Sequence, residues 1–375
     1  MPVWTSAPRA SLSGMDAENT APAAHAIVPP YLLARLAATQ EPRLAAASEA
    51  ARATLAAPRT YRPVRAQFDL SVDGGALVVE ASPSPDRTIS DAGTREVLPG
   101  VRVRGEDDPP TGDEAVDEAF DGLGATFALL WDAFERVSID GAGGSLLATV
   151  HYGDRYDNAF WNGERMVFGD GDGEVFTGFT GSITVIAHEL AHGVIESAGG
   201  LVYSGQSGAL NESIADVFGA LADQHQLGQT VDEASWLIGA GIFTDAVEGR
   251  ALRSMSEPGT AYDDDVLGKD PQPSHMRDFV VTTSDNGGVH INSGIPNKAF
   301  HLLATALGGH AWERAGGIWY RALTSGDLEP TSDFAAFAGA TAAAARREYG
   351  EDSEEHAAVR SAWAAVGVID HDPTG

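Results

Sequence analysis

The 375-residue sequence contains no cysteine. A disulfide framework is therefore excluded, and any metal site has to be built from His, Asp and Glu side chains. Basic residues are also scarce, since Asp and Glu outnumber Lys and Arg by 54 to 24 and the formal net charge is −30. Because phosphate binding requires clustered basic side chains, this charge argues against a nucleic-acid partner.

Long hydrophobic runs are missing as well. Hydrophobic residues make up 43% of the chain and the mean hydropathy is −0.13. No uncharged apolar run approaches the about 18 residues of a membrane-spanning helix, so no membrane partner is expected. The first 30 residues lack the basic start and apolar core of a secretory signal peptide. This predicts a cytoplasmic protein, or one secreted by a signal-independent route.

The pattern of apolar residues changes along the chain. An Ala- and Pro-rich stretch with helical character opens it, and residues 61–110 hold short strand-like runs between turns. Three- and four-residue spacings then predict an amphipathic helix over residues 113–139, followed by short strands with Gly and Asn turns. From residue 183 onward helical patterns dominate. The order indicates a mixed α+β protein.

The stretch TVIAHELAHGVIES (residues 184–197) carries two histidines one helical turn apart. His188 and His192 are at i and i+4, so on a helix both project from one face and can reach one metal ion. Glu189 lies about 100° round the helix, where it can reach a water on the metal without being a ligand. This is the His-Glu-x-x-His arrangement. The alternative is a pair of core histidines held by hydrogen bonds.

A third ligand is expected in the stretch GALNESIADVFG. Glu212 follows a Gly-rich loop and begins a second helix that can run back beside the first. Asp216 lies on the same face as Glu212 and can accept the outer N–H of a metal-bound histidine, and Asn211 is expected to support the ligands from the same helix. Taken alone, this stretch also fits a capped, acid-rich helix start.

His-Glu-x-x-His followed by Asn-Glu-x-x-x-Asp resembles the thermolysin family of zinc metallopeptidases, the gluzincins. The family's motifs are matched in order by TVHYGDRYDNAFWNGERMVFGDGDG, HELAHGVIESAGGLVYSGQSGALNESIADVFG, LRSMSEP and DNGGVHINSGIPNKAF. The resemblance implies a two-lobe α+β fold with a cleft between the lobes. The β-rich N-terminal lobe, which includes the zinc helix, is expected over residues 87–200, and the α-helical C-terminal lobe over residues 201–370.

The resemblance implies a neutral metalloendopeptidase. His188, His192 and Glu212 would bind one zinc ion, and Glu189 would be the general base that takes a proton from water and passes it to the leaving amine. Cobalt or manganese would also suit such a set of nitrogen and oxygen ligands.

The opposite wall of the cleft is expected to stabilise the oxyanion. By resemblance, His290 and Tyr203 would donate hydrogen bonds to it, and Asp285 would hold the ring of His290. Without the resemblance, His290 would be a loop histidine and Tyr203 a core aromatic residue.

Substrate-binding residues are implied by the same resemblance. Asn158 and the backbone of Ala159 would pair with the substrate main chain, as an edge strand does, and Arg253 would hold a substrate carbonyl. Val185 and Leu252 would make the pocket for the residue after the cleaved bond apolar, so cleavage is expected before bulky hydrophobic residues.

The N-terminal stretch VPPYLLARL resembles the short propeptide of protealysin-like members of the family. Residues 1–60, with an end uncertain between 50 and 86, are therefore expected to cover the cleft and to be removed by self-cleavage. Residues 61–110 would then be a linker and the start of the mature chain.

The chain departs from the family pattern where many members bind a pair of calcium ions. Thr184 replaces an expected Asp ligand, and the stretch ADQHQLGQTVDEASW is short and poor in acids. Calcium needs six to eight oxygen ligands, so a double calcium site is not expected. The acidic stretches at residues 169–173 and 262–266 are interpreted as turns.

Two other functions remain open at this point. A zinc aminopeptidase has similar ligands, but this sequence lacks the Gly-x-Met-Glu-Asn segment of that class. In the aminopeptidases the Glu ligand also lies closer to the second His than Glu212 does to His192 here. A catalytically silent zinc-binding scaffold would be expected to lose the base or the oxyanion donors, which are all present here.

Overall fold

The computed structural model describes residues 25–57, 70–73, 76–79 and 84–370. Its main sheet has six strands in the order β1-β7-β8-β6-β4-β5. Their bounds are β1 (His25–Ala26), β4 (Arg87–Asp91), β5 (Val101–Gly105), β6 (Leu146–Val150), β7 (Ala159–Trp161) and β8 (Met166–Phe168). The sheet is mixed, because β6 runs parallel to both β4 and β8 while the other pairs are antiparallel.

Residues 61–110, expected to be a linker and the start of the mature chain, include two strands of this sheet. β4 and β5 lie within residues 61–110, and β4 pairs with β6 from Arg87↔Leu146 to Asp91↔Val150. The turn-rich sequence around these strands hid them, because each strand is only five residues long and β4 also pairs with β6, more than 50 residues away. A second antiparallel pair, β2 (Leu70–Asp73) with β3 (Ala76–Val79), forms a separate two-stranded ladder.

The amphipathic helix expected over residues 113–139 is α3 (Glu114–Phe134). Asp113 caps its N-terminus by accepting a hydrogen bond from the backbone N–H of Val116 at 3.3 Å. The helix contacts β4 and β6 with its apolar face and lies against α4. It therefore connects the sheet to the central helices.

Two long helices form the centre of the molecule, α4 (Ile183–Ser197) and α5 (Gly205–Leu227). Nearly every residue of α4 is buried, which is typical of a helix surrounded by other elements. The two helices are in close contact at Gly219, where an added Cβ would lie 2.6 Å from the backbone oxygen of Thr184. A glycine is needed there because any side chain would push the helices apart.

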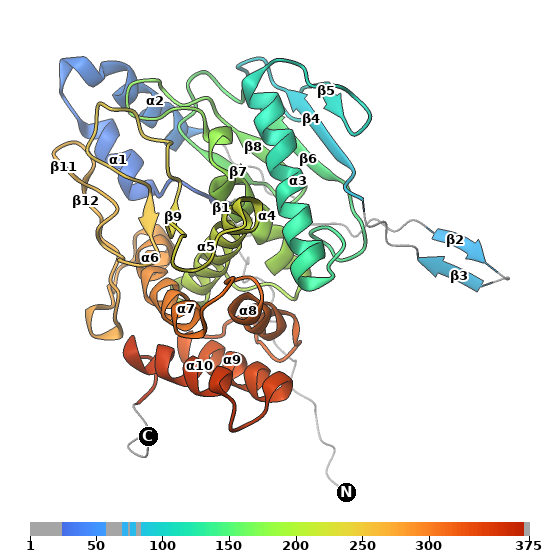
Figure 1. Ribbon diagram of the computed structural model, residues 1–375. Helices are drawn as coiled ribbons and strands as arrows, with labels where there is room; N and C mark the ends of the chain where they lie inside the picture. The colour runs from blue at the N-terminus through green and yellow to red at the C-terminus, as the bar shows by residue number, and fades with distance from the viewer. Residues whose placement is uncertain (1–24, 58–69, 74–75, 80–83, 371–375) are drawn as a thin grey trace, which may run out of the picture.

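The C-terminal part is helical, as the sequence predicts. Figure 1 shows its helices grouped below the central pair in orange and red. They are α6 (Asp285–Asn292), α7 (Gly294–Leu307), α8 (Arg314–Thr324), α9 (Phe334–Tyr349) and α10 (Glu354–Ala365). Two short ladders precede them, β9 (Leu237–Ile238) with β10 (Arg253–Ser254), and β11 (Asp263–Asp264) with β12 (Gly268–Lys269). The expected α+β class, with a mixed sheet and a helical C-terminal part, is confirmed.

The N-terminal stretch is folded onto the rest of the chain. After β1 it forms α1 (Pro30–Ala38), a 3₁₀ turn η1 (Pro42–Leu44) and α2 (Ala45–Ala56). Pro30 begins α1, where proline's fixed φ suits the first helical turn. Arg35 donates hydrogen bonds to the backbone oxygens of Val266 and Asp265 at 2.8 and 3.0 Å. Residues 58–69, 74–75 and 80–83 of the interval expected to contain the end of this stretch lie outside the described residues.

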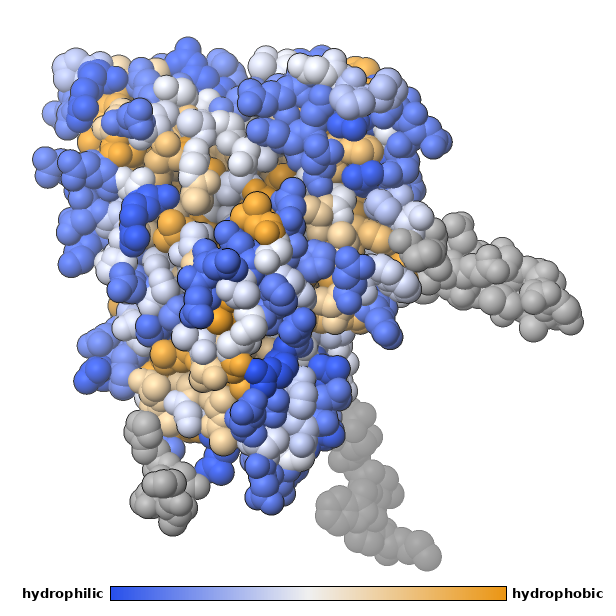
Figure 2. All heavy atoms as spheres, viewed as in Figure 1, coloured by the Kyte–Doolittle hydropathy of each residue, from blue (hydrophilic) through white to orange (hydrophobic). Residues whose placement is uncertain are grey.

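The surface view agrees with the composition. Figure 2 shows a face dominated by hydrophilic side chains, with apolar residues in scattered patches. None of the helices among the described residues is both long enough and apolar enough to span a membrane.

Candidate active site

The two histidines of α4 point their Nε2 atoms at one place. His188 places its Nδ1 2.8 Å from a carboxylate oxygen of Asp216, and His192 places its Nδ1 2.8 Å from the amide oxygen of Asn211. Both oxygens are acceptors, so each Nδ1 carries the proton. The Nε2 atoms are therefore the ring nitrogens that face each other, and they lie 3.2 Å apart.

Glu212 on α5 completes this cluster. Its carboxylate oxygens lie 3.5 Å from the Nε2 of His188 and 3.7 Å from the Nε2 of His192, and all three side chains are buried. Among the described residues, its Oε2 has no hydrogen-bond partner. Two ligands of a tetrahedral zinc ion at about 2.0–2.1 Å are about 3.3 Å apart, so these spacings fit a shared cation.

Asp216 connects the cluster to the side chains around it. This fully buried carboxylate accepts hydrogen bonds from His188, from Nε and Nη2 of Arg253 at 2.9 and 2.8 Å, and from Asn297 at 2.8 Å. Burial alone would raise the pKa of Asp216, but Arg253 and His188 together hold this pKa below its usual value. The carboxylate is therefore ionised and can fix the orientation of His188.

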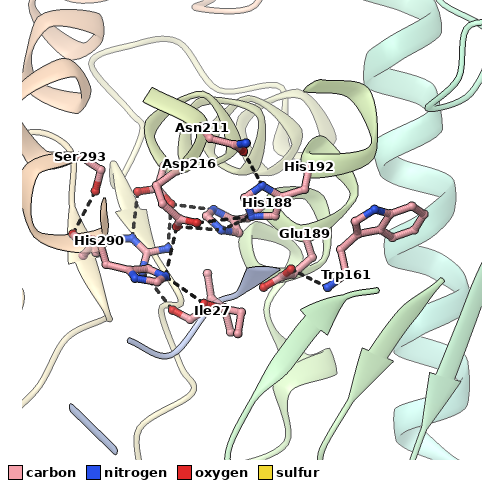
Figure 3. Close-up of polar contacts among 12 residues, drawn as sticks. Ile27, Trp161, His188, Glu189, His192, Asn211, Asp216, His290 and Ser293 are labelled. Carbon is pink, nitrogen blue, oxygen red and sulfur yellow. Dashed lines mark hydrogen bonds and ion pairs between the residues drawn. The ribbon is translucent and has the colours of Figure 1, made fainter. Parts of the chain in front are cut away.

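Glu189 lies on α4 between the two histidines and points toward the main sheet (Figure 3). Its Oε2 accepts a hydrogen bond from the backbone N–H of Trp161 at 2.8 Å. Its Oε1 is buried and has no hydrogen-bond partner among the described residues. One carboxylate oxygen is thus fixed by β7, while the other remains available to a water or a substrate group.

The expected pair His290 and Asp285 is brought together by a turn in left-handed backbone. Gly287 and Gly288 at the start of α6 have φ of +88° and +80°, values that favour glycine. This turn lets Asp285 accept from the backbone N–H of His290 at 2.9 Å and contact its Nδ1 at 2.6 Å. Burial alone would lower the pKa of His290, but Glu212 and Asp285 raise it above the usual value.

Tyr203 also lies at the cluster. Its hydroxyl donates a hydrogen bond to Oε1 of Glu212 and lies 3.3 Å from Nε2 of His290. The hydroxyl and the Nε2 of His290 therefore face the same space beside Glu212. Two donors in this position could both reach an oxygen atom bound there.

The edge strand β7 holds a peptide segment, His25–Val28 of the N-terminal stretch. β1 pairs antiparallel with β7, and the backbone N–H of Ile27 donates to the oxygen of Ala159 at 3.1 Å. The side-chain amide of Asn158 accepts from the N–H of Val28 at 2.9 Å and donates to the oxygen of Val28 at 3.2 Å. Asn158 and Ala159 therefore pair with the main chain of this segment.

The carbonyl groups of this segment meet the expected donors. His290 Nε2 lies 3.0 Å from the oxygen of Ala26, and Arg253 donates to the oxygen of Ile27 at 3.1 Å. The side chain of Ile27 is fully buried and belongs to the same hydrophobic cluster as Val185 and Leu252.

The positions considered for calcium are engaged in hydrogen bonds within the protein. Thr184 accepts from the backbone N–H of Gly239 at 2.8 Å. Asp172 accepts from the backbone N–H groups of Glu174 and Val175, both at 2.6 Å, which is the pattern of a turn.

One side chain of the cluster, His25, is not singled out by the sequence. Among the described residues, His25, His192 and Glu212 offer ligand atoms that all lie within 4.8 Å of one another. His25 lies three residues before the VPP motif, but no local pattern distinguishes it, because its approach to His192 depends on the pairing of β1 with β7.

Comparisons with known proteins agree with this geometry. The family model of the thermolysin metallopeptidase catalytic domain matches residues 96–196, and that of the alpha-helical domain matches residues 199–368. An "Extracellular metalloprotease" of Pectobacterium carotovorum subsp. carotovorum is 53% identical over 283 residues, covering 76% of this chain and 81% of the relative. "Protease PrtS" of Photorhabdus sp. (strain Az29) is 54% identical over 284 residues, 75% of this chain and 76% of the relative.

A solved structure is similar as well. The precursor of protealysin, a metalloproteinase from Serratia proteamaculans, superimposes with a TM-score of 0.83 at 48% identity, covering 92% of this chain and 100% of that chain.

The expectation of a cytoplasmic protein is wrong, whereas the alternative of secretion by a signal-independent route is not contradicted. The cytoplasmic expectation rested on the missing signal peptide, but a relative with more than half of its aligned residues identical is named extracellular. A signal peptide is only one route to the outside of a cell, so its apparent absence was weak evidence for location.

The family models cover well over half of the chain, and both relatives match across most of its length. The chain therefore belongs to the thermolysin family of metallopeptidases, in its protealysin-like group, and is a metalloendopeptidase.

Proposed function

We propose that this metalloendopeptidase cuts peptide bonds on the amino side of bulky hydrophobic residues, with a zinc ion held by His188, His192 and Glu212. The observation that carries the proposal is the segment His25–Val28, which lies along β7 as a bound peptide would. The spacing of the three side chains and the fixed Nδ1 protons of the two histidines support zinc as the metal.

Substrate binding follows the contacts of this segment. A substrate main chain pairs with Asn158 and the oxygen of Ala159, and Arg253 holds the carbonyl of the residue after the cleaved bond. Ile27 occupies that position in the structure, so the bond in the place of the cleaved one is Ala26–Ile27. Val185 and Leu252 favour an apolar side chain there because burying it removes apolar surface from water.

The remaining residues perform the proton transfers and stabilise charge. When bound, zinc supplies Lewis-acid polarisation of the carbonyl and lowers the pKa of water to about 7. Glu189 takes a proton from the attacking water and delivers it to the leaving amine. His290 and Tyr203 donate hydrogen bonds to the carbonyl oxygen as negative charge develops on it, and Asp285 keeps the ring of His290 in place.

A peptide series tests this function. Peptides that differ only in the residue after the cleaved bond should show kcat/KM at least about 10-fold higher for Leu, Ile or Phe than for Gly or Ala. Replacing Glu189 by Gln should lower kcat by about 10²–10⁴-fold, whereas Glu196→Gln on the same helix serves as the matched control. Equal kcat/KM across the series would refute the specificity. Zinc-loaded wild type that cuts no peptide would instead be a silent scaffold.

The proposal includes a precursor that processes itself. The N-terminal segment covers the cleft through β1, α1 and α2, which contact the catalytic part at Arg35, at Thr54 and at the backbone of Ala47. We expect it to be removed by a cut within residues 50–86. The relatives' names support an extracellular site of action for the processed enzyme.

Intact masses of purified wild type and Glu189→Ala after the same incubation test the self-processing. Loss of the N-terminal segment from wild type alone is the expected result. Equal shortening of both proteins would mean that another protease makes the cut.

A further inference from the structure

His25 lies at the centre of the cleft without a role in substrate binding. Its ring stacks on that of His192, with centroids 4.1 Å apart and planes inclined by 18°. Its other edge meets the ring of Tyr203 in a T-shaped contact at 4.3 Å. Within the described part of the chain, its buried Nδ1 has no hydrogen-bond partner.

A buried nitrogen without a partner is costly unless a donor or a metal satisfies it. Among the described residues, this ring contacts the rings of His192, a proposed zinc ligand, and Tyr203. His25 offers a ligand atom within 4.8 Å of those of both His192 and Glu212. The Nε2 of His188 lies 3.2 Å from that of His192 and 3.5 Å from Glu212, so His188 and His25 share these two neighbours.

The backbone fixes this position. His25 pairs with Trp161 across the β1–β7 ladder, and the next carbonyl, that of Ala26, contacts His290. The imidazole is therefore held over the site by the pairing of His25 and by the contact of the residue that follows it. The Ala26–Ile27 bond lies where a substrate bond is expected.

A peptide held in this register should be cut, unless water is kept away from it. We propose that His25 is a fourth ligand of the zinc ion in the uncut precursor and takes the position that a catalytic zinc site keeps open for water. This inference rests on the proposed zinc site of His188, His192 and Glu212.

The exchange is a simple substitution of ligands. One ring nitrogen of His25 donates its lone pair to the metal, and a water molecule leaves, with no change in oxidation state. Three imidazoles and one carboxylate make a closed tetrahedral set, which is the form of structural rather than catalytic zinc sites. When the N-terminal segment departs, His25 leaves with it and water regains the open position.

The test counts the histidines around zinc by X-ray absorption in the full-length Glu189→Ala precursor, which stays uncut under the proposed function. We expect three imidazoles in this precursor. His25→Phe, which keeps an aromatic ring to stack on His192 but has no lone pair, should reduce the count to two. His290→Phe and the remote His356→Phe on α10 should leave it at three.

Hydrogen exchange of the amides of α1 shows whether the segment stays docked in His25→Phe. A parent precursor with only two imidazoles at zinc would overturn the inference and leave the proposed zinc site intact. The inference would also be overturned if the third imidazole disappeared in His290→Phe and not in His25→Phe. Zinc content that does not fall in His188→Ala would sink the proposed function itself, so the two failures are distinguishable.

An activity measurement gives an independent result. With Glu189 restored, the His25→Phe precursor should convert to the short form faster than wild type, while His356→Phe should convert at the wild-type rate. An unchanged rate in His25→Phe, with the segment docked, would show that the imidazole does not withhold the water.

Discussion

At the residue scale, the candidate site depends most on Asp216. One buried carboxylate accepts four hydrogen bonds, from His188, from two nitrogens of Arg253 and from Asn297. It therefore links a proposed zinc ligand to the arginine that holds the carbonyl of Ile27. The metal and the substrate position share one support.

Asp216→Asn should weaken both the orientation of His188 and the pairing with Arg253. The amide cannot accept all four bonds, so His188 loses its fixed orientation, and we expect zinc affinity to fall about 10–100-fold. The buried guanidinium of Arg253 would also lose its ionised partner, which costs about 3–5 kcal/mol of stability in comparable pairs. Competition with a chelator measures the first effect and urea unfolding the second.

Asp223→Asn, on the same helix, is the control for this change. It should alter neither quantity appreciably, because no described hydrogen bond or ion pair of the cluster involves Asp223. An Asp216→Asn protein with wild-type zinc affinity would show that His188 needs no support from α5.

His151, which lies away from the cleft, makes a pH-dependent contribution to the free energy of unfolding. Its Nδ1 lies 2.9 Å from Asp170 and its Nε2 3.2 Å from Asp113, the cap of α3. Burial alone would lower the pKa of His151, but these two carboxylates raise it above the usual value. A raised histidine pKa contributes stability that is fully present below the unfolded pKa of about 6.5. This contribution is lost as pH rises through the folded pKa.

His151→Gln should therefore lower the free energy of unfolding at pH 5.5 more than at pH 9. The comparison belongs in the Glu189→Ala background, which avoids self-digestion during urea titrations. His356→Gln on α10 is the control and should show no comparable difference. A His151→Gln effect that grows with pH would contradict the sign of the raised pKa.

At the scale of the elements, the contact between α4 and α5 sets the spacing of the proposed ligands. His188 and His192 come from one helix and Glu212 from the other, so their separation depends on how closely the helices pack. Gly219 permits that contact, because a Cβ there would lie 2.6 Å from the oxygen of Thr184. The glycine thus acts on the metal site without touching it.

Gly219→Ala should push α5 away from α4. We expect a loss of about 1–3 kcal/mol from overpacking, together with weaker zinc binding as Glu212 moves. Gly339→Ala in α9 is a matched control, since no atom lies within 4 Å of the added Cβ. It should stabilise the protein by about 0.5–1 kcal/mol, because alanine restricts the unfolded chain.

Thermal unfolding and chelator competition on the two variants check this prediction. Unchanged zinc affinity in Gly219→Ala would mean that the helices adjust without moving Glu212.

The helices also show where sequence patterns succeed. The expected amphipathic helix of residues 113–139 corresponds to α3 (Glu114–Phe134), because a 3.6-residue period over several turns is a strong local signal. β4 and β5 were not recognised within the stretch interpreted as a linker and the start of the mature chain, because both are short and β4 pairs with β6, which is distant in the sequence.

At the scale of the whole molecule, the cleft is formed by segments that are distant in the sequence. Ile27 lies on the N-terminal segment, Ala159 on the main sheet and Arg253 on a short ladder. The backbone N–H of Ile27 donates to the oxygen of Ala159, and its carbonyl accepts from Arg253. A metal held by α4 and α5 would further join these parts. Folding stability and metal binding should therefore be coupled.

Removal of the metal should lower the melting temperature of the Glu189→Ala precursor. A ligand that binds only the folded state at 100 times its Kd adds about 2.7 kcal/mol of stability, and this contribution disappears in excess chelator. Re-addition of zinc should restore the melting temperature. Scanning calorimetry with and without chelator measures the shift.

The Glu189→Ala protein carrying His188→Ala in addition is the control. It lacks a proposed ligand, so the chelator should have much less effect on its melting temperature. An equal shift in both proteins would place the stabilising ion somewhere other than this cluster.

The sequence by itself determined the family, the mixed class of the fold and the helical C-terminal part, and it singled out His188, Glu189, His192 and Glu212. These signals are local, because helical spacing and short motifs depend on residues within a few turns of one another. Only the tertiary structure decided which residues face the cleft together. Val28 reaches Asn158 across 130 positions of the chain, and His25 reaches His192 only because β1 adds to the edge of the main sheet. No local pattern encodes such contacts, since the pairing of β1 with an edge strand is fixed by the fold as a whole.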